Sequence, residues 1–301
     1  MKKSIVVTGS SSGFGKLTVQ TLAKDGHRIF ATMRGVNGKN KSLANDLTKW
    51  AKENNAAVEV VELDVTSDES VTKAAQYING KVTGVDVVVN NAGIYGGGLD
   101  ETYSVQDYKN IFEVNVFGVL RVVRAFLPAM RKRETGLFVQ ISSLMGRFVI
   151  PFNGAYTSSK WAVEAIAESL RYELAPQGID SVIVQPGAFQ TELFGKIYQP
   201  ENSALTAEYT KTLPYYQSFG KTFGEMMSGE IPNKPQDVAD AIKGLVDLKA
   251  GERPLRVAVD KMMANTATPI NEAQAQVQAG FLGYMQLGDL LQTSNFELVE
   301  N

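Results

Sequence analysis

Thr8-Gly9-Ser10-Ser11-Ser12-Gly13-Phe14-Gly15 stands between a short apolar run at residues 4–8 and a segment with helical spacing that begins at once. A turn without bulky side chains lets backbone N–H groups approach a pyrophosphate, and the N-terminus of the following helix adds a partial positive charge. The glycines are spaced G-x-x-x-G-x-G rather than G-x-G-x-x-G, and any tight turn between a strand and a helix favours glycine. Because this turn lies in the first strand–turn–helix unit, we predict a dinucleotide site formed by Gly9, Ser11, Ser12, Gly13, Phe14 and Gly15.

Short runs rich in valine and isoleucine alternate with helical patterns from the N-terminus to about residue 185. This order is typical of stacked βαβ units. The pattern predicts a Rossmann-like α/β fold, a doubly wound, mostly parallel seven-stranded sheet with helices on both faces. We expect strands at 4–8, 28–32, 58–63, 85–90, 137–142, 180–185 and 255–259, and helices near 14–25, 42–55, 68–79, 104–132, 155–175 and 236–248.

No repeat, low-complexity tract or linker divides the sequence, so residues 1–301 are expected to form a single domain. Residues from about 193 to 231, rich in Tyr, Phe, Met and Gly, follow the sixth strand, where loops form the ligand crevice of such folds. They are interpreted as a mobile lid over an apolar substrate, with an ordinary packed insertion as the alternative. A C-terminal extension from about 261 to 301 is expected to form a helix that packs on the body or on a neighbouring subunit.

The composition narrows the range of possible chemistry. Of the 301 residues, 44% are hydrophobic and 21% charged, as in a folded protein, and a formal charge of −2 offers no general attraction to nucleic acid. With no cysteine and one histidine, disulfides, thiolate zinc sites and multi-histidine metal sites are excluded, and no metal is expected. His27 lies in the turn signal Asp25-Gly26-His27-Arg28 and is predicted to be solvated rather than catalytic.

The N-terminal apolar run is too short for a signal peptide, and no run approaches the roughly 18 apolar residues of a membrane span. We therefore expect a cytoplasmic protein whose partner is a small molecule, without nucleic acid or a membrane span.

The end of the second strand bears on the choice between NAD and NADP. NAD sites place a carboxylate there for the ribose hydroxyls, whereas NADP sites place a cation for the 2′-phosphate. The strand ends Ala31-Thr32-Met33-Arg34, and no acidic residue lies within 26–45. Arg34 is therefore predicted to bind the phosphate of NADP(H), with Lys39 and Lys41 behind it. A surface arginine in a loop would give the same pattern.

Ser143 ends the fifth predicted strand, and Tyr156-x-x-x-Lys160 opens the next helix. Residues four apart share a helix face, so the ammonium is expected to lower the pKa of the phenol and let it donate a proton to a carbonyl oxygen. The same spacing recurs at Tyr77 and Lys81, where a glycine interrupts the pair and no serine lies 13 positions upstream. We therefore predict that Ser143, Tyr156 and Lys160 form the catalytic group.

Taken together, these residues resemble the short-chain dehydrogenase/reductase family in its single-domain branch. The resemblance runs from about residue 4 to 260, and its motifs are the turn at 8–15, Asp64, Asn-Asn-Ala-Gly at 90–93, Asn115, Ser143 with Tyr156 and Lys160, and Pro186-Gly187 followed by Thr191. The end of the second strand is also similar to that of NADP-preferring hydroxysteroid and retinol dehydrogenases, which implies bulky apolar substrates.

The resemblance implies a role for each matched residue. Lys160 would bind the nicotinamide ribose, Ser143 would fix and polarise a carbonyl, and Tyr156 would be general acid in reduction or base in oxidation. Asn115 would anchor a water in a proton relay, although a lone asparagine among apolar neighbours is also typical of a core amide. The other cofactor contacts would be Asp64 and Val65 at the adenine, Asn91, Ala92 and Gly93 along the cofactor, and Pro186, Gly187 and Thr191 at the carboxamide.

The sequence thus predicts an NADP(H)-dependent oxidoreductase that interconverts a ketone or aldehyde with an alcohol. The alternative is a non-catalytic NADP(H)-binding regulator that senses redox state, and the complete set of Ser143, Tyr156 and Lys160 argues against it. The resemblance also implies a homodimer or homotetramer, formed through the helices predicted at 104–132 and 155–175.

Overall fold

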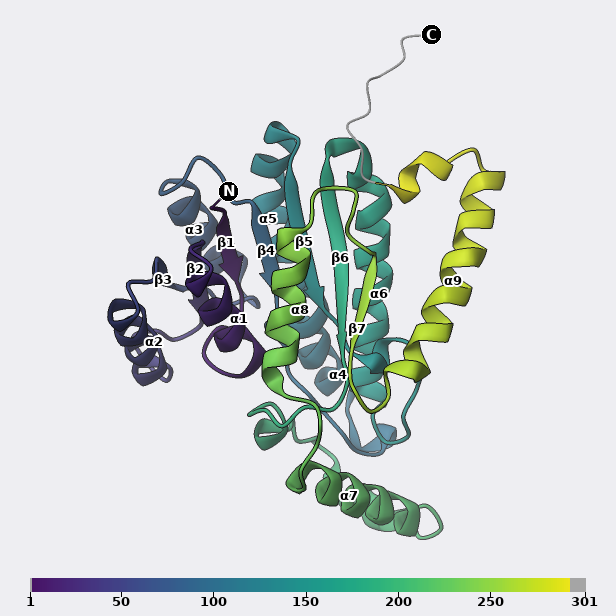
Figure 1. Cartoon of the computed structure of the whole chain (residues 1–301). Helices are drawn as coiled ribbons and strands as arrows, with labels where there is room; N and C mark the ends of the chain where they lie inside the picture. The colour runs from purple at the N-terminus through teal and green to yellow at the C-terminus, as the bar shows by residue number, and fades with distance from the viewer. Residues whose placement is uncertain (1, 293–301) are drawn as a thin grey trace.

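The computed structural model describes residues 2–292, which contain one seven-stranded sheet in the order β3-β2-β1-β4-β5-β6-β7 (Figure 1). All neighbouring strands pair in parallel. The chain winds outward from β1 in both directions, which confirms the predicted doubly wound α/β fold. The strands are β1 (Ser4–Val7), β2 (Arg28–Met33), β3 (Val58–Glu62), β4 (Val87–Asn90), β5 (Gly136–Ile141), β6 (Ile179–Pro186) and β7 (Arg256–Val259).

Helices cover both faces of the sheet (Figure 1). Helices α1, α2 and α8 pack on one face, and α3, α5 and α6 pack on the other. No helix within residues 2–292 combines the length and the apolar character that a bilayer span requires. The helices are α1 (Gly13–Lys24), α2 (Lys41–Glu53), α3 (Asp68–Asn79), α4 (Val105–Phe112), α5 (Gly118–Arg133), α6 (Gly154–Leu174), α7 (Leu213–Ser228), α8 (Pro235–Asp247) and α9 (Ala264–Tyr284).

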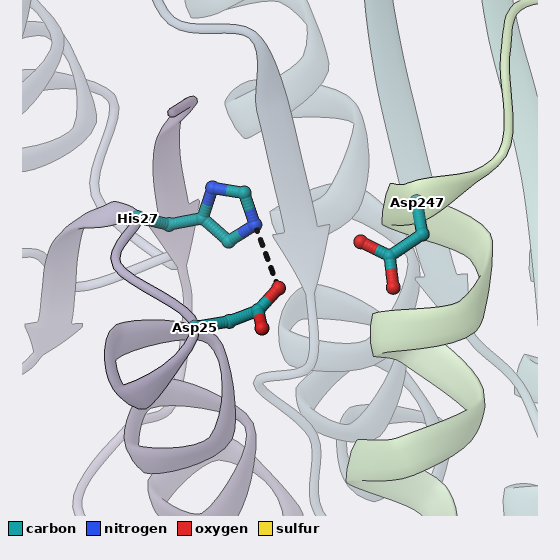
Figure 2. A group of neighbouring side chains, drawn as sticks. All are labelled: Asp25, His27 and Asp247. Atoms are coloured by element: carbon teal, nitrogen blue, oxygen red, sulfur yellow. Dashed lines mark ion pairs between the residues drawn. The ribbon is translucent and has the colours of Figure 1, made fainter. Parts of the chain in front are cut away.

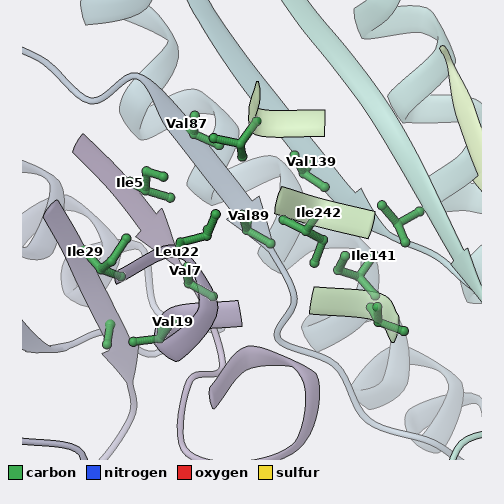
Figure 3. Packing of buried hydrophobic residues seen from close by; sticks show 14 of the residues in the cluster. Ile5, Val7, Val19, Leu22, Ile29, Val87, Val89, Val139, Ile141 and Ile242 are labelled. Atoms are coloured by element: carbon green, nitrogen blue, oxygen red, sulfur yellow. The ribbon is translucent and has the colours of Figure 1, made fainter. Parts of the chain in front are cut away.

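Alternation along β1 divides the core into two layers. Ile5 and Val7 point toward α1 and α8 and pack with Leu22 and Ile242 (Figure 3), whereas Val6 points to the opposite layer under α3, α5 and α6. Successive side chains of a strand face opposite sides, and each fully buried aliphatic side chain contributes about 1.5–3 kcal/mol. The two layers hold the strands in register, so the loops at their carboxyl ends meet at one edge.

The pattern at 104–132 predicts one helix, but the structure divides this segment. Helix α4 ends at Phe112, a π-helical turn spans Glu113–Phe117, and α5 begins at Gly118. Asn115 lies in the π turn and bonds to both backbone polar groups of Ile94. The wider π turn interrupts the i to i−4 backbone hydrogen bonds of the helix at the point where the chain contacts the loop after β4. Helical periodicity in the sequence does not reveal this contact.

The insertion and the C-terminal extension both form helices. The insertion holds two 3-10 turns, Phe194–Lys196 and Ser203–Glu208, followed by α7, which lies beyond the carboxyl ends of the strands (Figure 1). In the extension, α9 is joined to the body of the same chain, because Asn271 Nδ2 donates to Gln185 Oε1 at 2.7 Å and Gln274 Nε2 donates to Glu168 Oε2 at 2.8 Å. Residues 293–301 of the extension lie outside the described residues.

The prediction that His27 is solvated is wrong, since only 5% of its surface is exposed. Its Nδ1 accepts a hydrogen bond from the backbone N–H of Lys3 at 3.1 Å, and burial lowers its pKa. Its other nitrogen points toward Asp25, with Asp247 close by (Figure 2). Lys243 Nζ lies 3.2 Å from Asp25 Oδ2 and 2.6 Å from Asp247 Oδ2, so its ammonium forms an ion pair with each carboxylate. We assign this group to the packing of α1 against α8.

Candidate active site

A cavity of about 890 Å³ lies at the carboxyl edge of the sheet. All seven strands contribute to it at or just beyond their carboxyl ends, with Gly9, Met33, Leu63, Asn91, Ile141, Pro186 and Asp260 in chain order. The residues that the sequence predicts for the site line this cavity, except Gly15, Lys41 and Asn115. Predicted site residues up to 182 positions apart in sequence, from Gly9 to Thr191, are therefore brought together.

The glycine turn has the geometry that a close approach of a ligand to the backbone needs. Gly9 and Gly13 have φ angles of 67° and 52°, in the left-handed region that favours glycine. A Cβ on Gly9 would lie 2.8 Å from Ala92 Cα, and one on Gly15 would lie 2.4 Å from the Gly9 carbonyl oxygen. Gly15 therefore packs the turn rather than lining the cavity. The first turn of α1 is Gly-Phe-Gly-Lys, so Lys16 adds positive charge to the helix N-terminus.

The loops after β1 and β4 are locked together beneath the turn. Thr8 Oγ1 accepts hydrogen bonds from the backbone N–H groups of Asn91 and Ala92, each at 3.0 Å. In return, Asn91 Nδ2 donates to the carbonyl oxygens of Thr8 at 2.8 Å and Gly9 at 3.1 Å. The two segments that sequence reasoning assigns to the cofactor thus form one rigid floor of the cavity.

The far end of the cavity carries the predicted determinants of cofactor choice. Arg34 and Lys39 line it, whereas Lys41 does not. Asp64 Oδ1 accepts from the N–H of Thr66 at 3.0 Å and from its hydroxyl at 2.8 Å. Burial raises the pKa of Asp64, but these hydrogen bonds and the charge of Arg34 outweigh it, so the net pKa lies below its usual value. Asp64 is therefore an ionised acceptor at neutral pH.

One acidic residue near Arg34 escapes sequence analysis because it comes from another strand. Glu62 ends β3, and its carboxylate accepts from the backbone N–H groups of Gly35 and Val36, each at 2.7 Å. The carboxylate thus orders the loop that follows Arg34, and both of its oxygens have backbone partners. The contact arises because β2 and β3 pair with Met33 opposite Glu62. Sequence spacing alone does not show which residues of two strands are paired.

Ser143, Tyr156 and Lys160 meet at the centre of the cavity. Each is buried, with 8%, 7% and 6% of its surface exposed. Tyr156 and Lys160 occupy the first turns of α6, and Ser143 follows β5 and is hydrogen-bonded to the Tyr156 hydroxyl. Lys160 Nζ donates to the carbonyl oxygen of Ile141 at 2.8 Å and lies 5.6 Å from the centre of the Tyr156 ring. The predicted catalytic group is therefore assembled.

The expected direction of the Tyr156 pKa is wrong for this structure. Burial raises the pKa of Tyr156, and the hydrogen bond with Ser143 lowers it by less, so the net shift is upward. Burial also lowers the pKa of Lys160, to about 8. Desolvation disfavours both the phenolate and the ammonium, and the spacing of the two residues in sequence does not reveal this cost. The phenol is consequently protonated at neutral pH.

Asn115 stands behind the cavity rather than in its wall. It is 1% exposed, and its Oδ1 accepts from the N–H of Ile94 at 2.8 Å. Its Nδ2 donates to the Ile94 carbonyl oxygen and to Ser159 Oγ, both at 3.0 Å. Gly93 separates it from Lys160, since a Cβ on Gly93 would lie 3.4 Å from Asn115 Oδ1 and 3.8 Å from Lys160 Nζ. These bonds fit the core-amide interpretation, and its relay role stays a prediction.

The turn after β6 closes the cavity opposite the glycine turn. A Cβ on Gly13 would lie 3.7 Å from Thr191 Cβ, so the two turns face each other. Gly187 packs against Asp260, whose Oδ2 would lie 1.5 Å from a Cβ at that position. Asn233 Nδ2 donates to the carbonyl oxygen of Ala188 at 2.8 Å and to Asp260 Oδ1 at 2.9 Å. These contacts hold the predicted carboxamide-binding turn from below.

The wall beyond Tyr156 is largely apolar and comes mainly from segments to which sequence analysis gave no residue-level role. Three segments contribute to it: the loop after β4, the loop between β5 and α6, and the inner side of α7. The aromatic and methionine content of the insertion indicated an apolar lid but not which side chains face inward. The residues are Tyr95, Met145, Phe148, Ile150, Phe219, Phe223 and Met226.

A doubly wound sheet with Ser, Tyr and Lys at its carboxyl edge defines the class of nucleotide-dependent α/β oxidoreductases. Residues 3–202 match the family described as short chain dehydrogenase. Human retinol dehydrogenase 8 is 34% identical over 248 residues, which is 81% of this chain and 78% of that protein. The chain therefore belongs to the short-chain dehydrogenase family, as the resemblance predicted.

Solved structures agree with this assignment. A short-chain dehydrogenase from Streptomyces avermitilis superposes with a TM-score of 0.73 at 31% identity, covering 96% of this chain and 99% of that one. An alcohol dehydrogenase from Thermococcus sibiricus in complex with 5-hydroxy-NADP gives a TM-score of 0.69 at 26% identity, covering 87% and 97%. These relatives are named as dehydrogenases, and they give no support to the alternative of a non-catalytic regulator.

Proposed function

We propose that this chain is an NADP(H)-dependent oxidoreductase that interconverts a bulky apolar ketone or aldehyde with the corresponding alcohol. The observation that carries the proposal is that Ser143, Tyr156 and Lys160 share one cavity with the glycine turn and with Arg34. A site for proton transfer, a site for a pyrophosphate and a cation for a phosphate would then lie along one continuous surface.

The residues present fit a nicotinamide dinucleotide. Gly9 and Gly13, both with positive φ angles, form a turn without bulky side chains at the N-terminus of α1, where a pyrophosphate would bind. Asp64 is an ionised acceptor near the adenine end, and Arg34 with Lys39 would hold a 2′-phosphate. The NADP derivative bound to the Thermococcus sibiricus relative supports this choice of cofactor.

Proton transfer is the part of the reaction that the chain itself performs. The bound cofactor supplies or accepts the hydride. The hydrogen bond between Ser143 and Tyr156 holds their two hydroxyls next to each other, where both would polarise the carbonyl oxygen of a substrate. Because burial keeps Tyr156 protonated at neutral pH, it is ready to donate its proton in the direction of reduction. Lys160, fixed by the Ile141 carbonyl, holds its ammonium close to the phenol.

The cavity wall supports an apolar substrate. Phe219, Phe223 and Met226 of α7 and Met145 and Phe148 of the loop after β5 enclose the space beyond Tyr156. Apolar pockets with a few convergent polar groups orient a reacting carbonyl while burying the rest of the molecule. Similarity to a retinol dehydrogenase agrees with this substrate class.

The proposal is tested with Tyr156→Phe. In NADPH-dependent reduction of a panel of aliphatic, aromatic, steroid and retinoid carbonyls, we expect kcat to fall about 100-fold or more, because the proton donor is lost. NADPH binding, measured by nucleotide fluorescence, should change less than about twofold, since a phenyl ring keeps the packing.

Tyr77→Phe is the matched control, because Tyr77 has the same spacing to a lysine but lies on α3, 46% exposed, outside the cavity lining. It should keep wild-type kcat. A Tyr156→Phe enzyme that retained most of its kcat, or a wild type without turnover on the whole panel, would refute the proposed function.

A further inference from the structure

Tyr95 is a second buried tyrosine of the cavity, and its backbone is held on two sides. The preceding residue, Ile94, is bonded to Asn115 through both of its backbone polar groups. The carbonyl oxygen of Tyr95 accepts from the N–H of Tyr198 at 2.8 Å, in the insertion. The loop after β4 therefore presents this side chain from a fixed position between the π turn at Glu113–Phe117 and the insertion.

The side chain is as constrained as the backbone. Only 5% of Tyr95 is exposed, and its ring meets the ring of Tyr156 edge to face, with centres 5.0 Å apart and planes at 70°. The hydroxyl donates to Asn153 Oδ1 at 2.5 Å, and Asn153, itself 1% exposed, donates from Nδ2 to the Pro151 carbonyl oxygen at 2.8 Å. Asn153 also precedes the first turn of α6, which carries Tyr156.

The two tyrosine hydroxyls of the cavity differ in whether they can donate a proton to a substrate. Burial raises the pKa of Tyr95 to about 12, so its hydroxyl keeps its proton at any working pH. That proton is directed to Asn153, whereas the hydroxyl of Tyr156 is hydrogen-bonded to Ser143. Tyr95 is therefore no substitute for the acid. It contributes a rigid ring, and it also helps to keep water away from Tyr156.

We propose that Tyr95, held by Asn153, is a positioning and specificity-determining residue that fixes the Tyr156 ring and limits the width of the substrate beside the reacting carbonyl. This inference rests on the proposed function, because it assigns Tyr95 a task in the reaction of the same site. Edge-to-face aromatic pairs have a preferred geometry, so the Tyr95 ring restricts the tilt of the Tyr156 ring. The same ring is part of the cavity wall, where it occupies volume that a second substituent on the carbonyl carbon would need.

Little room exists for Tyr95 to move aside. A Cβ on Gly97 would lie 3.1 Å from its hydroxyl, and the same Cβ would lie 3.5 Å from Asn153 Oδ1. The loop therefore passes close behind the hydroxyl and blocks an outward swing. The Tyr95 ring therefore sets the width of the cavity at this point, and removing the ring would widen the cavity.

The experiment compares Tyr95→Ala and Tyr95→Phe with wild type on pairs of ketones that share one alkyl chain and carry either methyl or phenyl as the second substituent. Tyr95→Ala should raise the ratio of kcat/KM for phenyl over methyl ketones about tenfold, as expected for a pocket enlarged by several carbon atoms. Tyr95→Phe keeps the ring but frees it from Asn153, and should lower kcat about threefold to tenfold with little change in the ratio. NADPH affinity should stay within about twofold of wild type in both.

A pH profile separates positioning from a general loss of structure. Reduction requires protonated Tyr156, and water admitted by Tyr95→Ala would lower the pKa that burial now raises. The alkaline fall of the rate should therefore move to lower pH, whereas partial unfolding would lower the rate equally at every pH. Tyr77→Phe serves again as the control for loss of a hydroxyl elsewhere.

The possible results are distinct. A wild type that reduces no carbonyl overturns the proposed function and this inference together. An active wild type that loses activity with Tyr156→Phe, but whose Tyr95 variants keep the wild-type ketone ratio, kcat and pH profile, overturns the role of Tyr95 alone. The expected shifts in ratio and profile, with thermal unfolding close to that of wild type, support it.

Discussion

Lys160 and Tyr156 show how burial changes the chemistry of a motif that is simple in sequence. Spacing of four residues indicates that an ammonium faces a phenol, but the exposed fraction of each group decides the pKa. Here burial raises the pKa of Tyr156 and lowers that of Lys160 to about 8. A phenol that holds its proton suits reduction, and a lysine whose ammonium titrates near pH 8 makes its charge sensitive to moderately alkaline solution.

The residue-scale prediction concerns Arg34. Arg34→Ala should raise KM for NADPH about tenfold or more, since a charge-assisted hydrogen bond to a phosphate contributes about 1.5–3 kcal/mol. KM for NADH, which has no 2′-phosphate, should change less than about twofold. Steady-state kinetics with both cofactors measures the split.

Lys41→Ala is the control for loss of a positive charge, because Lys41 lies outside the cavity lining. It should leave both KM values near wild type. Equal increases of the two KM values in Arg34→Ala would show that another residue holds the phosphate.

Among the elements, α9 is joined to the loop that follows Ser143. Gln274 accepts a hydrogen bond from the guanidinium of Arg147 through Oε1 and donates to Glu168 of α6 through Nε2. Arg147 comes directly after the 3-10 turn Leu144–Gly146, which Ser143 caps by accepting from the N–H of Met145 at 3.2 Å. The amide of Gln274 thus joins α9 to the loop that follows Ser143 through one hydrogen bond and to α6 through another.

The element-scale prediction follows from the burial of these groups. Gln274→Ala removes the acceptor of a guanidinium that is 7% exposed, and should lower the free energy of unfolding by about 1–3 kcal/mol. Urea denaturation measures this loss. Replacement of the exposed neighbour Gln276 by Ala should change the free energy of unfolding little. Equal stability of the two variants would contradict a stabilising role for the hydrogen bonds of Gln274.

Across the whole molecule, one buried ion group ties the sheet to α6 and to the segment before β7. Asp180 is fully buried, and its two carboxylate oxygens pair with the guanidinium groups of Arg171, at 2.6 Å, and Arg253. Arg253 also donates to the carbonyl oxygen of Leu245 at 2.8 Å, at the end of α8. Three separate parts of the fold therefore depend on one carboxylate.

The whole-molecule prediction is that Asp180→Ala lowers the free energy of unfolding by about 3–5 kcal/mol, because two buried cations lose their counter-charge. Thermal and urea unfolding measure the change. Replacement of the exposed Glu69, which pairs with Lys73 on the surface of α3, by Gln should leave the melting temperature near wild type. A small effect of Asp180→Ala would mean that the cations find other partners.

Local patterns predicted the strands, most helices, the glycine turn and the grouping of Ser143, Tyr156 and Lys160 in one cavity, and the catalytic role of these three residues stays a prediction. These features depend on periodicities of 2 and 3.6 residues and on turn chemistry, which neighbouring residues determine. The patterns missed the π turn at Glu113–Phe117 and misplaced His27 in solvent, because both depend on contacts with distant segments. The homodimer or homotetramer stays a prediction.

Chain order and short-range spacing are enough to place Ser143, Tyr156 and Lys160 at the carboxyl edge of a parallel sheet, since parallel strands all end on that side. Tertiary packing alone decides how deeply those groups are buried, which sets the direction of their pKa shifts. It also decides that Tyr95 lies against Tyr156, because the two residues come from different segments and meet only when the loop after β4 is folded onto α6.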